Sequence, residues 1–281
     1  MRVYKYRPVR FYVATFLGTW IFWFLASVTS RIDNGGSFSF ALMALGLFMP
    51  PAVAVFMVLT SKSDALKQDF RKKLVEVFRI KPSVLVAAIL LFALVIVISI
   101  LLSTLFGQSL EQFALAEFSF SIGGMSTLLL FVVVAFLEEL GWRGYITDAL
   151  ASTMTWWKAT LIFGLFWSLW HLPLFFIPGT YQYGILQISP IYMVNFFVSI
   201  LPLSFFFTWV YVKTSRSSLA CMIFHFSVNF FQERVGMTDT TKCVQTFVLI
   251  VAAGIIVWRN KDLYFGTRHI GNLLGESRNP Q

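Results

Sequence analysis

The residues of this sequence that could do chemistry lie at the end of a long apolar stretch. Glu138, Glu139 and Arg143 occur in FLEELGWRGY, which directly follows the run STLLLFVVVA. An ionisable side chain inside a bilayer is costly unless it is paired or hydrated, so residues of this kind are candidates for function. Removal from water also makes a carboxylate a stronger base, which suits it to take a proton from a water molecule.

Two histidines occur in later apolar stretches. His171 lies in FWSLWHLP, and His225 and Asn229 are four residues apart in FHFSVNF, so they share one face of a helix. At 1.5 Å per residue, Glu138 and His171 each lie about 18 Å from the cytoplasmic end of their helices, and His225 lies about 12 Å from it. We expect these groups to line one polar cavity that opens to the cytoplasmic side. Asp148 is expected at the membrane interface.

Helix spacing separates the roles of the two glutamates. Glu139 and Arg143 are four residues apart and can pair along one side of a helix. Glu138 points about 100° away from Glu139, because a turn contains about 3.6 residues. The sequence therefore predicts that Glu139 is held by Arg143 and that Glu138 is free for chemistry. Cys221, one turn before His225, is expected to be a buried packing residue rather than a nucleophile.

These groups allow two kinds of hydrolysis. In the first, Glu138 and His171 activate a water molecule, and His225 and Asn229 donate hydrogen bonds to the oxyanion of the attacked peptide bond. In the second, Glu138, His171 and His225 are the three protein ligands of a catalytic zinc ion that keeps one position open. The residues alone do not separate the two.

The elements that position these groups must be membrane helices. Hydrophobic residues make up 58% of the chain and charged residues 12%, with a mean hydropathy of +0.76, whereas soluble domains carry about 25% charged residues. Pro50 and Pro51 are expected to kink the second span, and Pro173 to open the fifth near His171. The segment 107–120 is expected to lie along the interface. Eight stretches are long enough to cross about 30 Å of hydrocarbon as helices: 11–30, 38–60, 84–106, 121–149, 159–178, 189–212, 217–232 and 243–258.

The distribution of charge predicts the orientation in the membrane. Of the 22 Lys and Arg residues, only Arg31, Arg234 and Lys242 fall in the loops on one side, and Arg143 lies within the membrane. The others fall in the two termini and in the loops of the opposite side, so both termini are expected in the cytoplasm. The net charge of +9 then reflects orientation rather than binding of nucleic acid. The basic 61–83 loop is expected to attract anionic lipid.

Three motifs, taken in order, resemble those of a known family. EELGWR has the form E-E-x-x-x-R, WSLWH stands where the family has F-x-x-x-H, and HFSVN has the form H-x-x-x-N. Over about residues 121–258 the chain resembles the CAAX-processing and bacteriocin-processing intramembrane endopeptidases, which include the type II CAAX prenyl proteases. The resemblance divides the chain into N-terminal membrane helices (1–120), a protease core (121–258) and a cytoplasmic tail (259–281).

The resemblance implies cleavage of peptide bonds inside the membrane, and in prenylated substrates removal of the last three residues after the lipidated cysteine. Carried over to this chain, it makes Glu138 and His171 the groups that activate water and His225 and Asn229 the oxyanion donors. Glu139 and Arg143 complete the first motif in a supporting role, inferred from their pairing. The family has been considered both metal-dependent and metal-free. Because the zinc spacing H-E-x-x-H is absent, we expect no cofactor, with zinc as the alternative.

Other readings of the same residues remain. Glu138, His171 and His225 could form the relay of a proton-coupled transporter, although no inverted repeat is evident. A membrane scaffold or immunity protein could bind peptides in the same cavity without cleaving them.

For the protease, the expected partners are a prenylated or otherwise membrane-associated substrate and the bilayer itself. We expect an integral, multi-pass membrane protein, located in the cell membrane if the source is prokaryotic. Trp167, where the motif has Phe, is expected to reshape the pocket wall.

Overall fold

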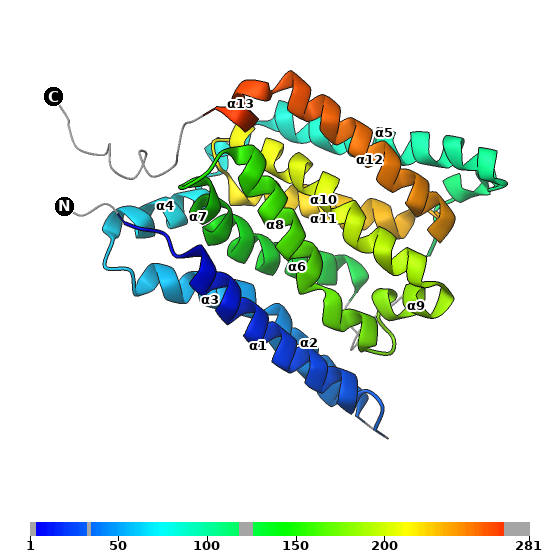
Figure 1. Ribbon diagram of the computed structural model, residues 1–281, viewed down its shortest axis with the longest axis horizontal. Coiled ribbons are helices and arrows are strands. Elements are labelled where there is room, and N and C mark those ends of the chain that lie inside the picture. The colour runs from blue at the N-terminus through cyan, green and yellow to red at the C-terminus, as the bar shows by residue number, and fades with distance from the viewer. Residues whose placement is uncertain (1–3, 33–34, 118–125, 267–281) are drawn as a thin grey trace.

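A computed structural model describes residues 4–32, 35–117 and 126–266, and these residues form a bundle of helices (Figure 1). No strand is formed among them, and Leu115 and Val235 make a single isolated bridge. The expected all-α class is confirmed. The helices are α1 (Pro8–Thr29), α2 (Gly36–Leu47), α3 (Met49–Leu59), α4 (Asp64–Val75), α5 (Pro82–Ser103), α6 (Thr127–Gly141), α7 (Thr147–Ala151), α8 (Trp156–Trp170), α9 (Tyr181–Ile188), α10 (Pro190–Lys213), α11 (Ser218–Arg234), α12 (Asp239–Arg259) and α13 (Lys261–Phe265).

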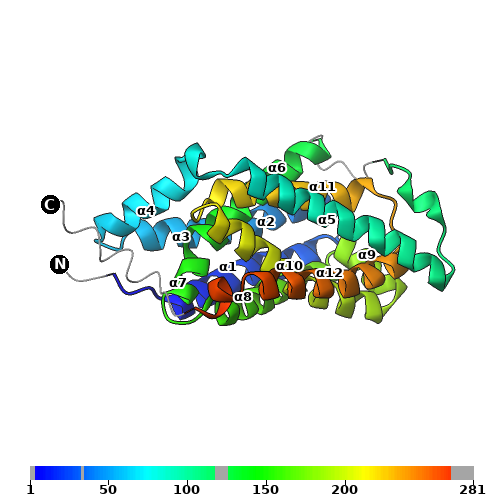
Figure 2. The ribbon, with the colours of Figure 1, turned by 90° about the horizontal axis from the view of Figure 1, so that it is seen from above.

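The bundle is organised around four central helices. In Figure 1, α1 and α2 run along one side of the molecule and α5 and α12 along the other, with α6, α8, α10 and α11 between them. Figure 2 shows that α6 and α11 lie in one layer and that α8 and α10 lie in the other. All four begin at a Ser or Thr whose side-chain oxygen accepts an N–H of the first turn. These caps are Ser126, Thr155, Ser189 and Ser217.

Six helical segments of the described chain are long and apolar enough to cross a membrane, so the protein is an integral membrane protein, but the expected number of eight spans is not confirmed. Two of the expected spans, 121–149 and 217–232, do not qualify, and both carry candidate site residues. The helical stretch 127–151 contains Glu138, Glu139 and Arg143, and α11 is only 17 residues long. Both pack inside the bundle, with α6 against α11. The charged side chains of the first stretch lower its apolar signal, and the second is too short to count as a span.

Prolines interrupt two spans at the expected places. The second span breaks at Phe48 into α2 and α3, and Pro50 and Pro51 occupy the first turn of α3. The fifth span leaves α-helical geometry after Trp170, with His171 as the cap residue and a 3₁₀ turn, Leu172–Phe176, behind it. Pro173 in this turn has no N–H with which to continue the α-helix. His171 therefore lies at a helix end within the bundle.

Several predictions about the segments between spans require correction or fall outside the described residues. The 61–83 loop contains α4, and Lys73 on this helix is fully buried rather than facing lipid. Asp148, expected at the membrane interface, is also fully buried among side chains, and its carboxylate pairs with Lys73. The 107–120 segment was expected to lie along the membrane interface. In the structure it is tied to the end of α11, because the Ala116 N–H donates to the Arg234 carbonyl oxygen at 2.9 Å. The predicted domain boundary at residue 120 and the tail beyond residue 266 lie outside the described part of the chain.

Candidate active site

Glu138 lies in the last turn of α6 and is held by two indole groups. Its side chain is almost fully buried. Trp142 Nε1 donates to Glu138 Oε2 at 3.1 Å, and Trp167 Nε1 donates to the same oxygen at 2.8 Å. Both donors are neutral, so they orient the carboxylate without compensating its charge. Because both bonds fall on Oε2, the other oxygen, Oε1, is the one that can act on a water molecule.

Glu139 forms the predicted ion pair with Arg143 and also binds a histidine. Arg143 donates to Glu139 Oε1 at 3.0 Å, and His225 Nδ1 lies 2.9 Å from the same oxygen. All three side chains are buried, and the Arg143 guanidinium also lies 4.5 Å from the ring centroids of both Phe163 and Phe207. A cation over aromatic rings is stabilised by the negative charge of their faces. The contact between Glu139 and His225 was not predicted from the sequence.

His171 is oriented by the backbone of its own helix. Its Nδ1 lies 2.8 Å from the carbonyl oxygen of Trp167. A carbonyl can only accept, so Nδ1 carries a proton, and the Nε2 atom of the neutral ring has a free lone pair. The ring packs edge-on against Trp170 and Phe196. Glu138 and His225 interact electrostatically with it. His171 is therefore set up to accept a hydrogen bond through Nε2.

Trp167 is the residue around which the candidate groups gather. Its indole N–H binds Glu138, and its ring centroid lies 6.3 Å from that of His171 and 5.7 Å from that of His225. These side chains come from the end of α6, the end of α8 and the middle of α11. The structure thus brings together the carboxylate and the two imidazoles predicted to share a site. Trp167 was predicted only to alter the pocket wall, yet it also donates a hydrogen bond that Phe could not make.

Asn229 lies one helical turn beyond His225 on α11, as the spacing predicted. Its side chain is partly exposed, and its amide makes no hydrogen bond to another described residue. The amide is therefore available to a substrate. Cys221 is buried on the same helix, in agreement with the prediction of a packing residue, and its sulfur is 3.9 Å from the Phe207 carbonyl oxygen.

The helix that carries the two glutamates continues as a π-helical turn, η4 (Trp142–Ile146), hereafter the π turn. Turns of this kind inside α-helices occur frequently at functional sites. Close packing surrounds it: a Cβ added at Gly141 would lie 2.6 Å from Pro50 Cβ, and one added at Gly144 would lie 2.8 Å from Phe70. The sequence prediction of one continuous helix did not include this turn.

Sequence reasoning also missed a buried ionic cluster below the π turn. It consists of Lys73, Asp69, Asp148 and Arg216, together with the hydroxyl of Tyr211. Lys73 Nζ lies 2.7 Å from Asp148 Oδ2, and Tyr211 donates to Asp148 Oδ1 at 2.9 Å. Burial opposes ionisation of Asp69, but Lys73 and Arg216 beside it hold its pKa below the ordinary value. Basic residues spread over a predicted loop gave no signal that one of them is buried.

The structure shows no ready-made metal site. Among the described residues, no three His, Cys, Asp or Glu side chains form a group that could hold a metal ion. The predicted set of Glu138, His171 and His225 is therefore not arranged as zinc ligands here, and we derive no step through a metal.

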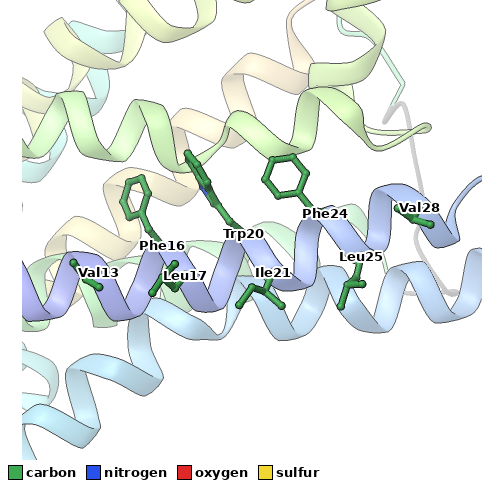
Figure 3. Close-up of a pocket in the computed structure, with 8 residues that line it drawn as sticks. All are labelled: Val13, Phe16, Leu17, Trp20, Ile21, Phe24, Leu25 and Val28. Atoms are coloured by element: carbon green, nitrogen blue, oxygen red, sulfur yellow. The ribbon is translucent and has the colours of Figure 1, made fainter.

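An apolar groove of about 690 Å³ runs along α1. Figure 3 shows Phe16, Trp20 and Phe24 directed from α1 toward α8. Trp20 Nε1 donates to the carbonyl oxygen of Trp170 at 3.3 Å, one residue before His171. The other residues that line the groove are Val13, Leu17, Ile21, Leu25 and Val28.

Comparison with known proteins assigns this arrangement of residues to a protease family. The model of the type II CAAX prenyl endopeptidases (Rce1-like) matches residues 120–231, which contain every candidate site residue. The CAAX prenyl protease 2 of Methanococcus maripaludis is 39% identical over 263 residues, covering 93% of this chain and 97% of that protein. These similarities favour a protease over the transporter and the scaffold. Across nearly its whole length, the chain therefore belongs to the type II CAAX prenyl endopeptidases, and it is a protease embedded in a membrane.

Proposed function

We propose that the protein hydrolyses a peptide bond near the C-terminus of prenylated, CAAX-type or other membrane-associated substrates. One observation carries the proposal: the carboxylate of Glu138 and the rings of His171 and His225 surround a single indole, that of Trp167. A carboxylate base, a neutral imidazole and a second imidazole paired with a carboxylate are the groups needed to activate water and to stabilise an oxyanion.

In the proposed reaction, Glu138 Oε1 takes a proton from a water molecule that also donates a hydrogen bond to His171 Nε2. The water oxygen attacks the substrate carbonyl carbon and forms a tetrahedral intermediate. When the carbon–nitrogen bond breaks, Glu138 returns its proton to the departing amine. The two indole donors on Oε2 support this cycle because they bind the carboxylate in a fixed orientation without supplying a counter-charge.

The proposed oxyanion donors are His225 and Asn229. Since Glu139 is an acceptor, His225 Nδ1 must carry the proton of their 2.9 Å contact. His225 can then donate through Nε2 only when its ring is protonated, and the carboxylate of Glu139 lies at its other nitrogen. The Asn229 amide supplies a second, neutral donor from the next turn of α11. Arg143 fixes Glu139, so it acts through Glu139 and not on the substrate itself.

For a lipidated substrate, the apolar groove along α1 offers a surface for the lipid chain, and Trp20 joins this groove to the backbone beside His171. We further propose that both termini and the opening of the site face the cytoplasm, because the Lys and Arg residues are concentrated on that side. Accessibility of cysteines introduced at the two ends of α12 to an impermeant thiol reagent, in sealed vesicles, tests the orientation.

The test of the function is a peptide-cleavage assay with purified protein in detergent or liposomes. A farnesylated C-a-a-X peptide is compared with the same peptide without its lipid, and the products are identified by mass spectrometry. We expect release of the last three residues from the lipidated peptide and no release by the Glu138→Gln variant. Absence of cleavage of either peptide by folded wild-type protein would contradict the proposal. Equal cleavage of both peptides would show that the substrate does not need a lipid.

A further inference from the structure

Lys73 connects α4 to the π turn that follows the two glutamates. Its side chain is fully buried, and Nζ donates to the carbonyl oxygen of Gly144 at 2.8 Å. The same nitrogen lies 3.4 Å from the carbonyl oxygen of Arg143 and 2.7 Å from Asp148 Oδ2. A lysine is rarely buried completely unless each of its donors has a partner. Here two of those partners are backbone atoms of the π turn.

The π turn needs such donors because it breaks the regular pattern of backbone hydrogen bonds. The N–H of Thr147 bonds the carbonyl of Trp142, five residues back. In an α-helix this N–H would bond the carbonyl of Arg143. That carbonyl instead accepts from the Tyr211 hydroxyl at 3.1 Å and is approached by Lys73. A buried carbonyl left without a donor costs free energy, so these two side chains stabilise the π turn.

The rest of the ionic cluster holds Lys73 in place. Arg216 contacts Asp69 and lies 3.2 Å from Asp148 Oδ2, so two positive and two negative groups balance one another in a largely buried cluster. Ser215 and Arg216 have φ angles of 55° and 64°, in the left-handed region that residues other than glycine seldom adopt. Such a conformation persists only where surrounding contacts compensate it, and here it delivers Arg216 into the cluster.

The π turn also holds the catalytic end of the helix. The backbone of Arg143 is bound by the cluster, while its guanidinium binds Glu139, and Glu139 binds His225 Nδ1. The packing between α4 and the π turn leaves no room for a Cβ at Gly144. A displacement of Lys73 would therefore be passed through one residue, Arg143, to the pair that stabilises the oxyanion.

We propose that Lys73 is a positioning residue for hydrolysis: by binding the carbonyls of the π turn it fixes Arg143, and through Arg143 the Glu139–His225 pair. The inference rests on the proposed function, because it assigns the pair a role in that reaction. Lys73 touches no reacting atom. A substitution of Lys73 should therefore lower kcat rather than raise KM, because misplacement of a catalytic group by 1 Å can cost about 100-fold in rate.

The first experiment compares Lys73→Met with Lys72→Met, which makes the same chemical change at the adjacent, partly exposed position of α4. Cleavage of the farnesylated peptide is measured over a range of substrate concentrations, and thermal unfolding in detergent shows whether each variant is folded. We expect Lys73→Met to lower kcat by about tenfold or more with KM within about twofold of the wild type, and Lys72→Met to change neither. Lys73→Arg, which retains the charge and the donors, is expected to restore part of kcat.

A variant that leaves every charge in place covers the case in which Lys73→Met does not fold. Tyr211→Phe removes only the hydroxyl that binds the Arg143 carbonyl and Asp148. We expect it to lower kcat in the same direction with KM retained. If Lys73→Met folds, unchanged kcat in that variant overturns the inference. If it does not fold, unchanged kcat in Tyr211→Phe overturns it.

Two further measurements separate positioning from general stability. In a Glu139→Gln background, Lys73→Met should change kcat by less than about twofold, because coupled groups are not additive; an undiminished effect there would show that Lys73 acts by another route. Hydrogen exchange of the amides of residues 142–148 should be faster in Lys73→Met than in Lys72→Met. If the wild type cleaves no peptide, the proposed function fails, and the exchange measurement alone decides whether Lys73 holds the π turn.

Discussion

The indole N–H of Trp167 donates a hydrogen bond of 2.8 Å to Oε2 of Glu138. The two residues lie on different helices, and the family motif has Phe at the tryptophan position. In this chain the tryptophan therefore binds the proposed base directly, in addition to forming part of the wall of the site.

Replacing Trp167 with Phe removes this bond and keeps an aromatic ring. Trp142 still donates to the same oxygen, so the carboxylate loses one of two constraints. A hydrogen bond to a charged group contributes about 1.5–3 kcal/mol, and we expect kcat/KM to fall by about tenfold or more. Trp157→Phe, at a partly buried position that packs on Phe205, is the matched control. Equal kcat/KM in folded Trp167→Phe and wild-type protein would show that the bond is not used in catalysis.

Glu138→Gln tests the assignment of the base. The glutamine oxygen can still accept from both indoles, but the side chain can no longer take a proton from water. Since general base catalysis contributes about 10²–10⁴-fold, we expect kcat to fall by at least about 100-fold with the thermal unfolding transition of the wild type or a higher one. Retention of full cleavage would exclude Glu138 as the base.

Glu139→Gln and His225→Gln test the pair that is proposed to stabilise the oxyanion. Because Glu139 acts through His225, the double variant should lose little more activity than His225→Gln alone, which we expect to be reduced by about 100-fold or more. The cleavage rates of the wild type, the two single variants and the double variant together form a double-mutant cycle. Losses that simply multiply would show that the contact between the two side chains has no role in the reaction.

The metal question has a separate test. Since the three candidate ligands do not form a metal-holding group among the described residues, we expect purified active protein to contain no stoichiometric zinc by elemental analysis. We also expect activity to survive treatment with a chelator. The expectation would be contradicted by a stoichiometric metal whose removal abolishes cleavage and whose return restores it. His171 and His225 would then be arranged differently in the active protein.

Acid should destabilise the fold through the ionic cluster. The pKa of Asp69 is lowered in the folded protein because Lys73 and Arg216 outweigh the effect of burial. The unfolded chain therefore takes up a proton first as the pH falls, and the stability contributed by ionised Asp69 is present above about pH 4 and is lost below it. Thermal unfolding between pH 3 and 7 in detergent should show a smaller decrease below about pH 4 for Asp69→Asn than for the wild type. Parallel curves would exclude this contribution.

What the sequence determined by itself follows from composition and helical periodicity. The hydropathy of the chain places it in a membrane, and the prolines at 50, 51 and 173 mark the breaks in two spans. The pair Glu139–Arg143 could be predicted because side chains four residues apart in one helix meet whatever the helix packs against. By the same rule Trp142 could have been recognised as a partner of Glu138. The family motifs named the remaining site residues without indicating what binds them.

Only the tertiary structure decided the contacts between helices. The bonds from Trp167 to Glu138 and from His225 to Glu139 depend on how α6, α8 and α11 pack, and no periodicity within one segment encodes that packing. The burial of Lys73 and Asp148 was missed for the same reason, because each alone is costly to bury and their mutual compensation exists only when distant segments meet. The π turn is likewise a tertiary effect: its displaced carbonyls are satisfied by side chains from α4 and α10, which a local reading of residues 142–146 does not contain.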